Sequence, residues 1–308
     1  MLRIGTIAGA VLLLLLASEP PGRNKPVAAF DPNHNALVVF GGYPARGPIM
    51  DDAWLWKNNT WTSLEKTQFA PRAASGVAVD SHRRRIVAFG GDGPSGALGD
   101  TAEWDGRAWH VVAASGPPAR SVPQLAYDAR RRRIVMFGGR DPVARRLLGD
   151  TWEFDGSHWT EVSTNGPAPR FQHAMTYDAA RGKVILFGGN SGKELLGDTW
   201  LWDGATWTQE SGPAPPARDH NAIAYDESRQ AVVMFGGWDN KAFLSDIWEW
   251  TGVWRRIDAT GPDARGGLPT MVYDSARRLI VLYGGYGTNG PFTDLWAWDG
   301  RAWRRQSD

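Results

Sequence analysis

Side chains able to bind a ligand follow six glycine pairs that recur along the chain. The pairs occupy positions 41–42, 90–91, 138–139, 188–189, 236–237 and 284–285, so they are 48 to 50 residues apart. The residues that come next differ from copy to copy: Tyr43, Asp92, Arg140, Asn190, Trp238 and Tyr286. Aromatic rings beside directional polar groups suit a sugar or an extended peptide. We therefore predict a ligand-binding site at these six residues and Asp239; the alternative is ordinary polar loops with stray aromatic residues.

One arginine also recurs in each copy, ahead of the first predicted strand: Arg23, Arg72, Arg120, Arg170, Arg218 and Arg265. The arginines could pair with an aspartate that opens the third strand of the same copy: Asp52, Asp100, Asp150, Asp198, Asp246 and Asp294. A second interpretation is an anion-binding collar formed by Arg72, Arg120, Arg170 and Arg218 with His173 and His220. We favour the Arg–Asp contact, because a group repeated six times is more often structural. The two histidines occupy unmatched repeat positions, so we expect no metal site.

Other classes of chemistry are excluded or disfavoured. The chain has no cysteine, which excludes thiol catalysis, zinc–thiolate sites and disulfides. Its formal net charge of +1 gives no global attraction to nucleic acid. The arginine runs at 83–85 and 130–133 are interpreted as solvated turns. No carboxylate pair or nucleophile–histidine spacing marks a catalytic centre, so we expect no catalytic residue and no cofactor.

Four short strands in each copy must position these residues. In the fourth copy the first strand is predicted at 172–177 and the second at 184–187, where VILF is apolar throughout. Such a run indicates a strand covered on both faces. The glycine pair should end it. The third strand carries Trp200 and Trp202 on one face, and an Asp-Gly turn leads to the fourth strand.

An apolar strand ending in Gly-Gly, then an aromatic residue, then a tryptophan a few residues on resembles the kelch repeat. The resemblance covers the whole chain after residue 20 and implies an all-β, six-bladed propeller of a bacterial secreted type, with four antiparallel strands in each blade. The predicted blades are 20–65, 66–113, 114–163, 164–211, 212–258 and 259–308. We expect no blade to contain strands from both ends of the chain. The ring of blades should therefore be closed by packing of blade 6 against blade 1. The superfamily includes the central domain of galactose oxidase, but its copper radical site needs a cysteine that is missing here.

The first 18 residues stand outside the repeat. Arg3 precedes the apolar stretch 4–16, and small residues follow it. Thirteen apolar residues are too few for a spanning helix and are typical of a signal peptide. An uncleaved N-terminal anchor and a misassigned start codon stay open as alternatives. We expect a secreted, periplasmic or cell-surface protein.

The predicted function is a protein- or glycan-binding scaffold that uses the face bearing the variable loops. The alternative is a carbohydrate-active enzyme of the sugar epimerase or mutarotase type. We expect a monomer that binds neither nucleic acid nor, apart from a possible anchor, a membrane. Trp152, Trp200 and Trp207 should lie between blades, whereas Trp238 has no tryptophan counterpart in the other copies and should lie in an exposed loop.

Overall fold

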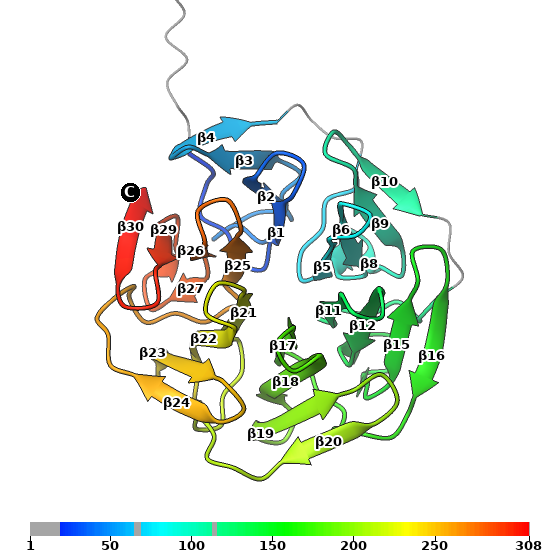
Figure 1. The fold of residues 1–308 in the computed structure, drawn as a ribbon. Helices are drawn as coiled ribbons and strands as arrows, with labels where there is room; N and C mark the ends of the chain where they lie inside the picture. Colours follow the sequence, from blue (N-terminus) through cyan, green and yellow to red (C-terminus); the bar gives the residue numbers. More distant parts are fainter. Residues whose placement is uncertain (1–18, 65–68, 113–115, 308) are drawn as a thin grey trace, which may run out of the picture.

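The repeat of 48 to 50 residues corresponds to a four-stranded antiparallel sheet that occurs six times around a central axis (Figure 1). The computed structural model describes residues 19–64, 69–112 and 116–307. Within these ranges no helix is long and apolar enough to cross a membrane. The predicted all-β, six-bladed propeller is confirmed. The predicted leader at 1–18 lies outside the described residues.

Each blade runs from an inner strand beside the axis to an outer strand at the rim. The inner strands are β1 (Val27–Asp31), β5 (Gly76–Asp80), β11 (Gln124–Asp128), β17 (Ala174–Asp178), β21 (Ala222–Asp226) and β25 (Thr270–Asp274). The second strands are β2 (Ala36–Phe40), β6 (Arg85–Phe89), β12 (Arg133–Phe137), β18 (Lys183–Asn190), β22 (Ala231–Trp238) and β26 (Leu279–Tyr283).

Farther from the axis, the third strand of each blade pairs with the outer strand through a short turn. The third strands are β3 (Ala53–Lys57), β9 (Thr101–Trp104), β15 (Thr151–Phe154), β19 (Leu195–Trp202), β23 (Phe243–Trp250) and β29 (Leu295–Trp298). The outer strands are β4 (Thr60–Ser63), β10 (Trp109–Val112), β16 (Trp159–Ser163), β20 (Trp207–Glu210), β24 (Trp254–Ile257) and β30 (Trp303–Ser307).

The glycine pair ends the second strand in blades 1, 2, 3 and 6, as predicted, but the prediction is wrong for blades 4 and 5. There β18 and β22 continue through the glycines, and a register shift lets pairing with the third strand resume beyond them. In blades 2, 3 and 6 the same region forms separate small ribbons: β7 (Asp92–Gly93) with β8 (Gly96–Ala97), β13 (Arg140–Asp141) with β14 (Arg146–Leu147), and β27 (Tyr286–Gly287) with β28 (Gly290–Pro291).

The hydrophobic core consists of clusters that each join two adjacent blades. The apolar second strands are buried on both sides, so that Ile134 through Phe137 are at most 1 % exposed. The Trp207 ring of blade 4 lies 5.4 Å from the Phe137 ring of blade 3, which confirms its predicted place between blades. Trp152 and Trp200 also pack against such clusters, and like Trp207 they are half-buried.

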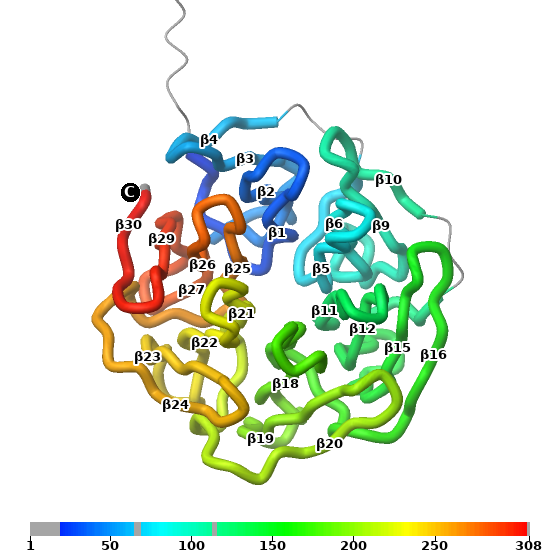
Figure 2. The backbone as a smooth tube through the Cα atoms, in the orientation of Figure 1, coloured from blue at the N-terminus to red at the C-terminus, as the bar shows by residue number. Residues whose placement is uncertain are grey.

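Among the described residues, no strand is exchanged between the first and last blades, as predicted. Figure 2 shows the red end of the chain beside the blue beginning. Side chains close this seam: the Trp61 and Tyr283 rings are 5.0 Å apart, and the Arg277 guanidinium lies 4.4 Å from the centre of the Trp56 ring. The ring is therefore closed by side-chain packing.

Alternating strand directions place the connections on two faces. The lower face carries the turns between first and second strands and between third and fourth strands. The upper face carries the loops after the glycine pairs and the connections into each inner strand. The inner strands surround a central channel, and its opening on the upper face is called the upper mouth below.

Candidate functional site

The six residues after the glycine pairs occupy equivalent places around the upper mouth. Each forms an isolated antiparallel bridge with the residue that follows the repeated arginine: Asn24 with Tyr43, Ala73 with Asp92, Ser121 with Arg140, Phe171 with Asn190, Asp219 with Trp238, and Gly266 with Tyr286. The second glycine permits this approach. Gly91 has φ +97°, and a Cβ on it would lie 2.5 Å from the Ala73 carbonyl oxygen.

A ring of backbone, called the hoop below, surrounds the upper mouth one residue beyond each bridge residue, or two residues beyond it in blade 6, where Gly267 intervenes. Its members share a left-handed φ of 50° to 60° although none is glycine: Lys25, Ala74, Val122, Gln172, His220 and Leu268. The amide N–H groups of Ala74, Val122, His220 and Leu268 donate to carbonyl groups of the neighbouring blade at 2.8 to 3.3 Å. The backbone of the hoop repeats while its side chains do not. Specificity for a ligand can therefore reside in those side chains without disturbing the fold.

The first polar cluster joins three blades at one side of the mouth. The Tyr43 hydroxyl of blade 1 and the Ser121 hydroxyl of blade 3 both donate to the carboxylate of Asp92 in blade 2. Burial, followed by the hydrogen bond and charge of Asp92, raises the pKa of Tyr43. The tyrosine therefore stays a neutral donor at physiological pH, and the Asp92 carboxylate has a defined orientation.

A second polar cluster lies on blades 4 and 5. Asp219 is 3 % exposed; it accepts a hydrogen bond from Asn190 Nδ2 at 3.2 Å and contacts His220 Nδ1 at 2.7 Å. In each cluster a donor from a neighbouring blade contacts the carboxylate: Tyr43 and Ser121 contact Asp92, and Asn190 contacts Asp219. Three of the predicted ligand-binding residues, Tyr43, Asp92 and Asn190, lie in these clusters.

Lys25 connects the two clusters electrostatically. Burial lowers the pKa of its ammonium group, and the charges of Asp92 and Asp219 act in the opposite direction. To the residues that the structure describes, this ammonium donates no hydrogen bond. Lys25 also lines an upper chamber of about 140 Å³ together with Gln124, Asn221 and Leu268. The mouth thus offers free donors beside oriented carboxylates, a combination that suits a ligand with both donors and acceptors.

Aromatic side chains form a third part of the mouth, on blades 5 and 6. The Phe243 ring lies 4.9 Å from Trp238 and 6.4 Å from Tyr286, tilted by 57° and 56°. The three rings therefore form a contiguous but not coplanar aromatic surface, called the aromatic platform below. The predicted loop position of Trp238 is wrong. It is the last residue of β22 and pairs with Phe243 of β23, because this blade continues its hairpin beyond the glycine pair. The ring is half-buried, whereas Tyr286 is 39 % exposed.

The remaining predicted binding residues are less engaged with the mouth. Arg140 is exposed. One carboxylate oxygen of Asp239 accepts the backbone N–H groups of Lys241 and Ala242 at 2.9 and 2.8 Å, and these hydrogen bonds lower the pKa of Asp239. Asp239 therefore orders the tip of its own hairpin.

The repeated arginines pair with the repeated aspartates in all six blades, which confirms the favoured Arg–Asp contact. In blade 3, for example, Arg120 is 0 % exposed and its two terminal nitrogens contact Asp150 at 2.7 and 2.8 Å. The pairs are Arg23–Asp52, Arg72–Asp100, Arg120–Asp150, Arg170–Asp198, Arg218–Asp246 and Arg265–Asp294. Guanidinium groups directed at these carboxylates argue against an anion-binding collar.

The two histidines of that collar have different surroundings. His173 is fully buried with its ring 5.6 Å from Phe137, and burial followed by the charge of Arg170 lowers its pKa to about 3. His220 instead lies in the hoop, beside Asp219. In the part of the chain that the structure describes, no group of three or more potential ligands could hold a metal ion.

The sequence reasoning missed Lys25, Ser121 and Phe243 as members of the mouth. A signal for the first two was present: the residues directly after each repeated arginine vary between copies as strongly as those after the glycine pairs. Phe243 gave no comparable signal, because its contact with Trp238 depends on the longer hairpin of blade 5.

Comparison with known proteins agrees with this architecture. A model of the KLHDC2/KLHL20/DRC7 Kelch-repeats domain matches residues 102–211, from the third strand of blade 2 through the outer strand of blade 4. No curated protein matches the chain. The family match and the six blades together support a kelch-repeat propeller.

Proposed function

We propose that this kelch-repeat propeller is a binding scaffold that captures a protein partner at its upper mouth, outside the cytoplasm and without catalysis. The observation that carries the proposal is the group of Lys25, Asp92 and Asp219. These three residues do not recur in the other blades, and the repeat does not need them for its own structure. Rigid scaffolds commonly present binding groups in this way, on loops over invariant sheets.

A glycan is the second candidate ligand, favoured by the aromatic platform of Trp238, Phe243 and Tyr286. Flat aromatic surface beside polar groups binds the apolar face of a sugar ring while neighbouring groups bind its hydroxyls. A carbohydrate-active enzyme of the epimerase or mutarotase type is the third candidate. It is favoured by Tyr43–Asp92 and His220–Asp219, which are of the residue types used in acid–base catalysis.

Removing mouth side chains should weaken ligand capture without unfolding the protein. The chain lacking residues 1–18 is applied to peptide and glycan arrays, and the affinity for each retained ligand is measured by calorimetry. We expect Tyr286→Ala and Lys25→Met each to weaken binding about tenfold or more, as for interface hot spots. Tyr286→Ala should change the free energy of unfolding by at most about 0.5 kcal/mol, since exposed substitutions have small effects.

Arg107→Ala, on the lower face, is the matched control and should leave affinity unchanged. Equal affinity of all these variants for the retained ligands would place the binding site elsewhere. Incubation of the same protein with free sugars separates binding from catalysis. A change of anomer or epimer that Asp92→Asn abolishes would replace the scaffold proposal with the enzyme.

The proposal that the protein is exported depends on the apolar stretch at 4–16. We expect the natively expressed protein to begin between Ser18 and Pro20 when its N-terminus is determined by mass spectrometry. An intact Met1 in the soluble cytoplasmic fraction would contradict export.

A further inference from the structure

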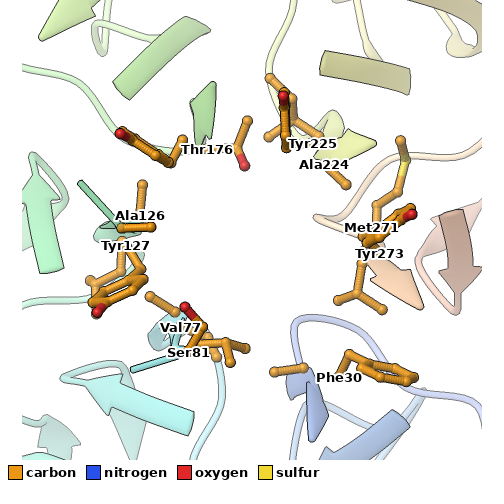
Figure 3. A pocket seen from close by; sticks show the side chains of 18 of the residues that line it. Phe30, Val77, Ser81, Ala126, Tyr127, Thr176, Ala224, Tyr225, Met271 and Tyr273 are labelled. Atoms are coloured by element: carbon orange, nitrogen blue, oxygen red, sulfur yellow. The ribbon is translucent and has the colours of Figure 1, made fainter. Parts of the chain in front are cut away.

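The lower half of the central channel is a separate chamber that opens away from the upper mouth. It has a volume of about 360 Å³ and is lined by the inner strands of all six blades (Figure 3). Six apolar residues border both this lower chamber and the upper one: Ala28, Val77, Leu125, Met175, Ile223 and Met271. They form the apolar ring, called the waist below, at which the two chambers meet.

The wall of the lower chamber is mostly carbon. Its aromatic members occupy the same position on five inner strands: Phe30, Tyr127, Tyr177, Tyr225 and Tyr273. In Figure 3 the oxygen ends of Tyr127, Tyr225 and Tyr273 point away from the hollow. Burial, followed by the nearby carboxylate of Asp80 in the preceding blade, raises the pKa of Tyr127 to about 12. Tyr127 therefore stays neutral, and its ring borders the chamber without adding charge.

A single carboxylate provides the formal charge of the lining. Glu227 stands at the lower rim of the chamber, and no lysine, arginine or histidine is among the described residues that line it. Burial, followed by the charge of Asp226, raises the pKa of Glu227. A cation bound beside Glu227 would interact with the Glu227 carboxylate, since the buried Asp226 carboxylate is already paired with Arg229.

The lower rim carries charges of both signs. In three blades one arginine lies between two carboxylates: Asp80–Arg83–Glu103, Asp128–Arg131–Glu153 and Asp226–Arg229–Glu249. Each trio has two negative charges and one positive charge, so its net charge is −1. The exposed arginines of this face, such as Arg132 and Arg278, lie one residue before their second strands. The aspartates of these trios end the inner strands and are paired with arginines, so the rim has no uniform charge and Glu227 is the charged residue of the lining itself.

We propose that the lower chamber binds a small organic cation, an ammonium group attached to an apolar or aromatic body. The chamber has the volume of a small-molecule site, about 300–1,000 Å³. Its apolar waist and wall match the body of such a ligand, and its aromatic rings and Glu227 match the charge, since aromatic rings and carboxylates both attract ammonium groups. An organic anion would meet no cation in the described lining. This site does not depend on the function proposed for the upper mouth.

Phenyltrimethylammonium is a suitable probe, with benzyl alcohol and benzenesulfonate as neutral and anionic probes of similar size. Calorimetry of the chain lacking residues 1–18 should show one phenyltrimethylammonium bound per chain, weaker binding of benzyl alcohol and none of benzenesulfonate. Glu227→Gln should weaken binding of the cation about three- to tenfold, and Ser275→Glu, which adds a carboxylate at the same rim, should tighten it by a similar factor. Both residues are at exposed rim positions, so both variants should fold.

The controls separate this chamber from the mouth. Tyr286→Ala should leave phenyltrimethylammonium binding unchanged, so failure of the upper-mouth proposal would not affect this result. A competition experiment compares how a short lysine-containing peptide and n-pentylamine displace the bound probe. Displacement by the peptide at the lower concentration would assign the ammonium group to a polypeptide. Displacement by n-pentylamine at the lower concentration would assign it to a free amine. Equal binding of the three probes would overturn the proposal. So would cation binding that neither Glu227→Gln nor Ser275→Glu changes.

Discussion

Asp150→Ala is expected to destabilise the propeller by about 3–5 kcal/mol, because it leaves a buried guanidinium without its counter-charge. Arg120 is 0 % exposed, and Asp150 accepts hydrogen bonds from both of its terminal nitrogens. The same carboxylate accepts Trp152 Nε1 at 2.7 Å, so one substitution removes three hydrogen bonds. The free energy of unfolding from urea titrations measures the effect.

Two further variants make this test specific. Arg304→Ala removes an exposed partner 3.4 Å from Asp299 and should change stability by at most about 1 kcal/mol. The double variant Arg120→Met/Asp150→Leu should recover much of the lost stability, since an apolar pair of similar size needs no counter-charge. If Asp150→Ala costs no more than Arg304→Ala, the pair does not hold the blade together.

The Arg–Asp pairs also predict the sign of the pH dependence. Burial alone would raise the pKa of Asp150, but the hydrogen bonds and charge of Arg120, with Trp152, lower it below 3.8. The same holds, with their own arginine and tryptophan partners, for Asp52, Asp198, Asp246 and Asp294. A lowered pKa in the folded state gives stability that is present above the unfolded pKa and is lost as pH falls through the folded one. The urea midpoint should therefore fall between pH 5 and pH 3, and less so in Arg120→Met/Asp150→Leu.

Trp202→Ala should have an effect of similar size, about 3–5 kcal/mol, because it removes a large ring from a closely packed interface. Trp202 is 0 % exposed, lies 5.5 Å from Trp207, and donates through Nε1 to Glu153 of blade 3 at 3.0 Å. Trp200→Ala, two residues away on the same strand, should have a smaller effect because Trp200 is half-buried. Thermal denaturation followed by calorimetry ranks the two variants.

Trp202→Phe separates packing from hydrogen bonding. It keeps an aromatic ring in the interface but removes the donor to Glu153, and a loss of about 1 kcal/mol is expected for that hydrogen bond. Equal destabilisation by Trp200→Ala and Trp202→Ala would show that burial in the interface does not govern the stability of this propeller.

The fold could be predicted from the sequence because the repeated residues are the ones that build a blade. Gly-Gly permits the close bridge between the inner connection and the loop, and the repeated arginine and aspartate form the buried pair. The repeated tryptophan packs on the preceding blade. Each of these is a local requirement that every copy must meet. Six copies in phase therefore specified the architecture without knowledge of any contact between blades.

The mouth was predicted only in part, because its contacts join residues from different copies. Tyr43 and Asp92 were both identified, but their hydrogen bond depends on the angle between blades 1 and 2. Lys25 lies near Asp92 and Asp219 only because the ring closes. The lower chamber escaped prediction for a related reason: Tyr127 and its equivalents occur in a repeated position, and such a position is explained equally well by contacts between blades.

Blade closure without exchanged strands has a consequence for how such a protein can change over generations. Each sheet comes from one uninterrupted stretch of chain, so duplication or loss of about 48 codons would add or remove one complete sheet with all its strand pairings. In a ring whose last sheet combines strands from both ends of the chain, duplication or loss of a repeat at either end of the gene would leave that sheet without one or more of its strands. Here a new copy needs only matching neighbours on its two sides. Changes in ring size, and with them in channel width, are therefore accessible through single recombination events.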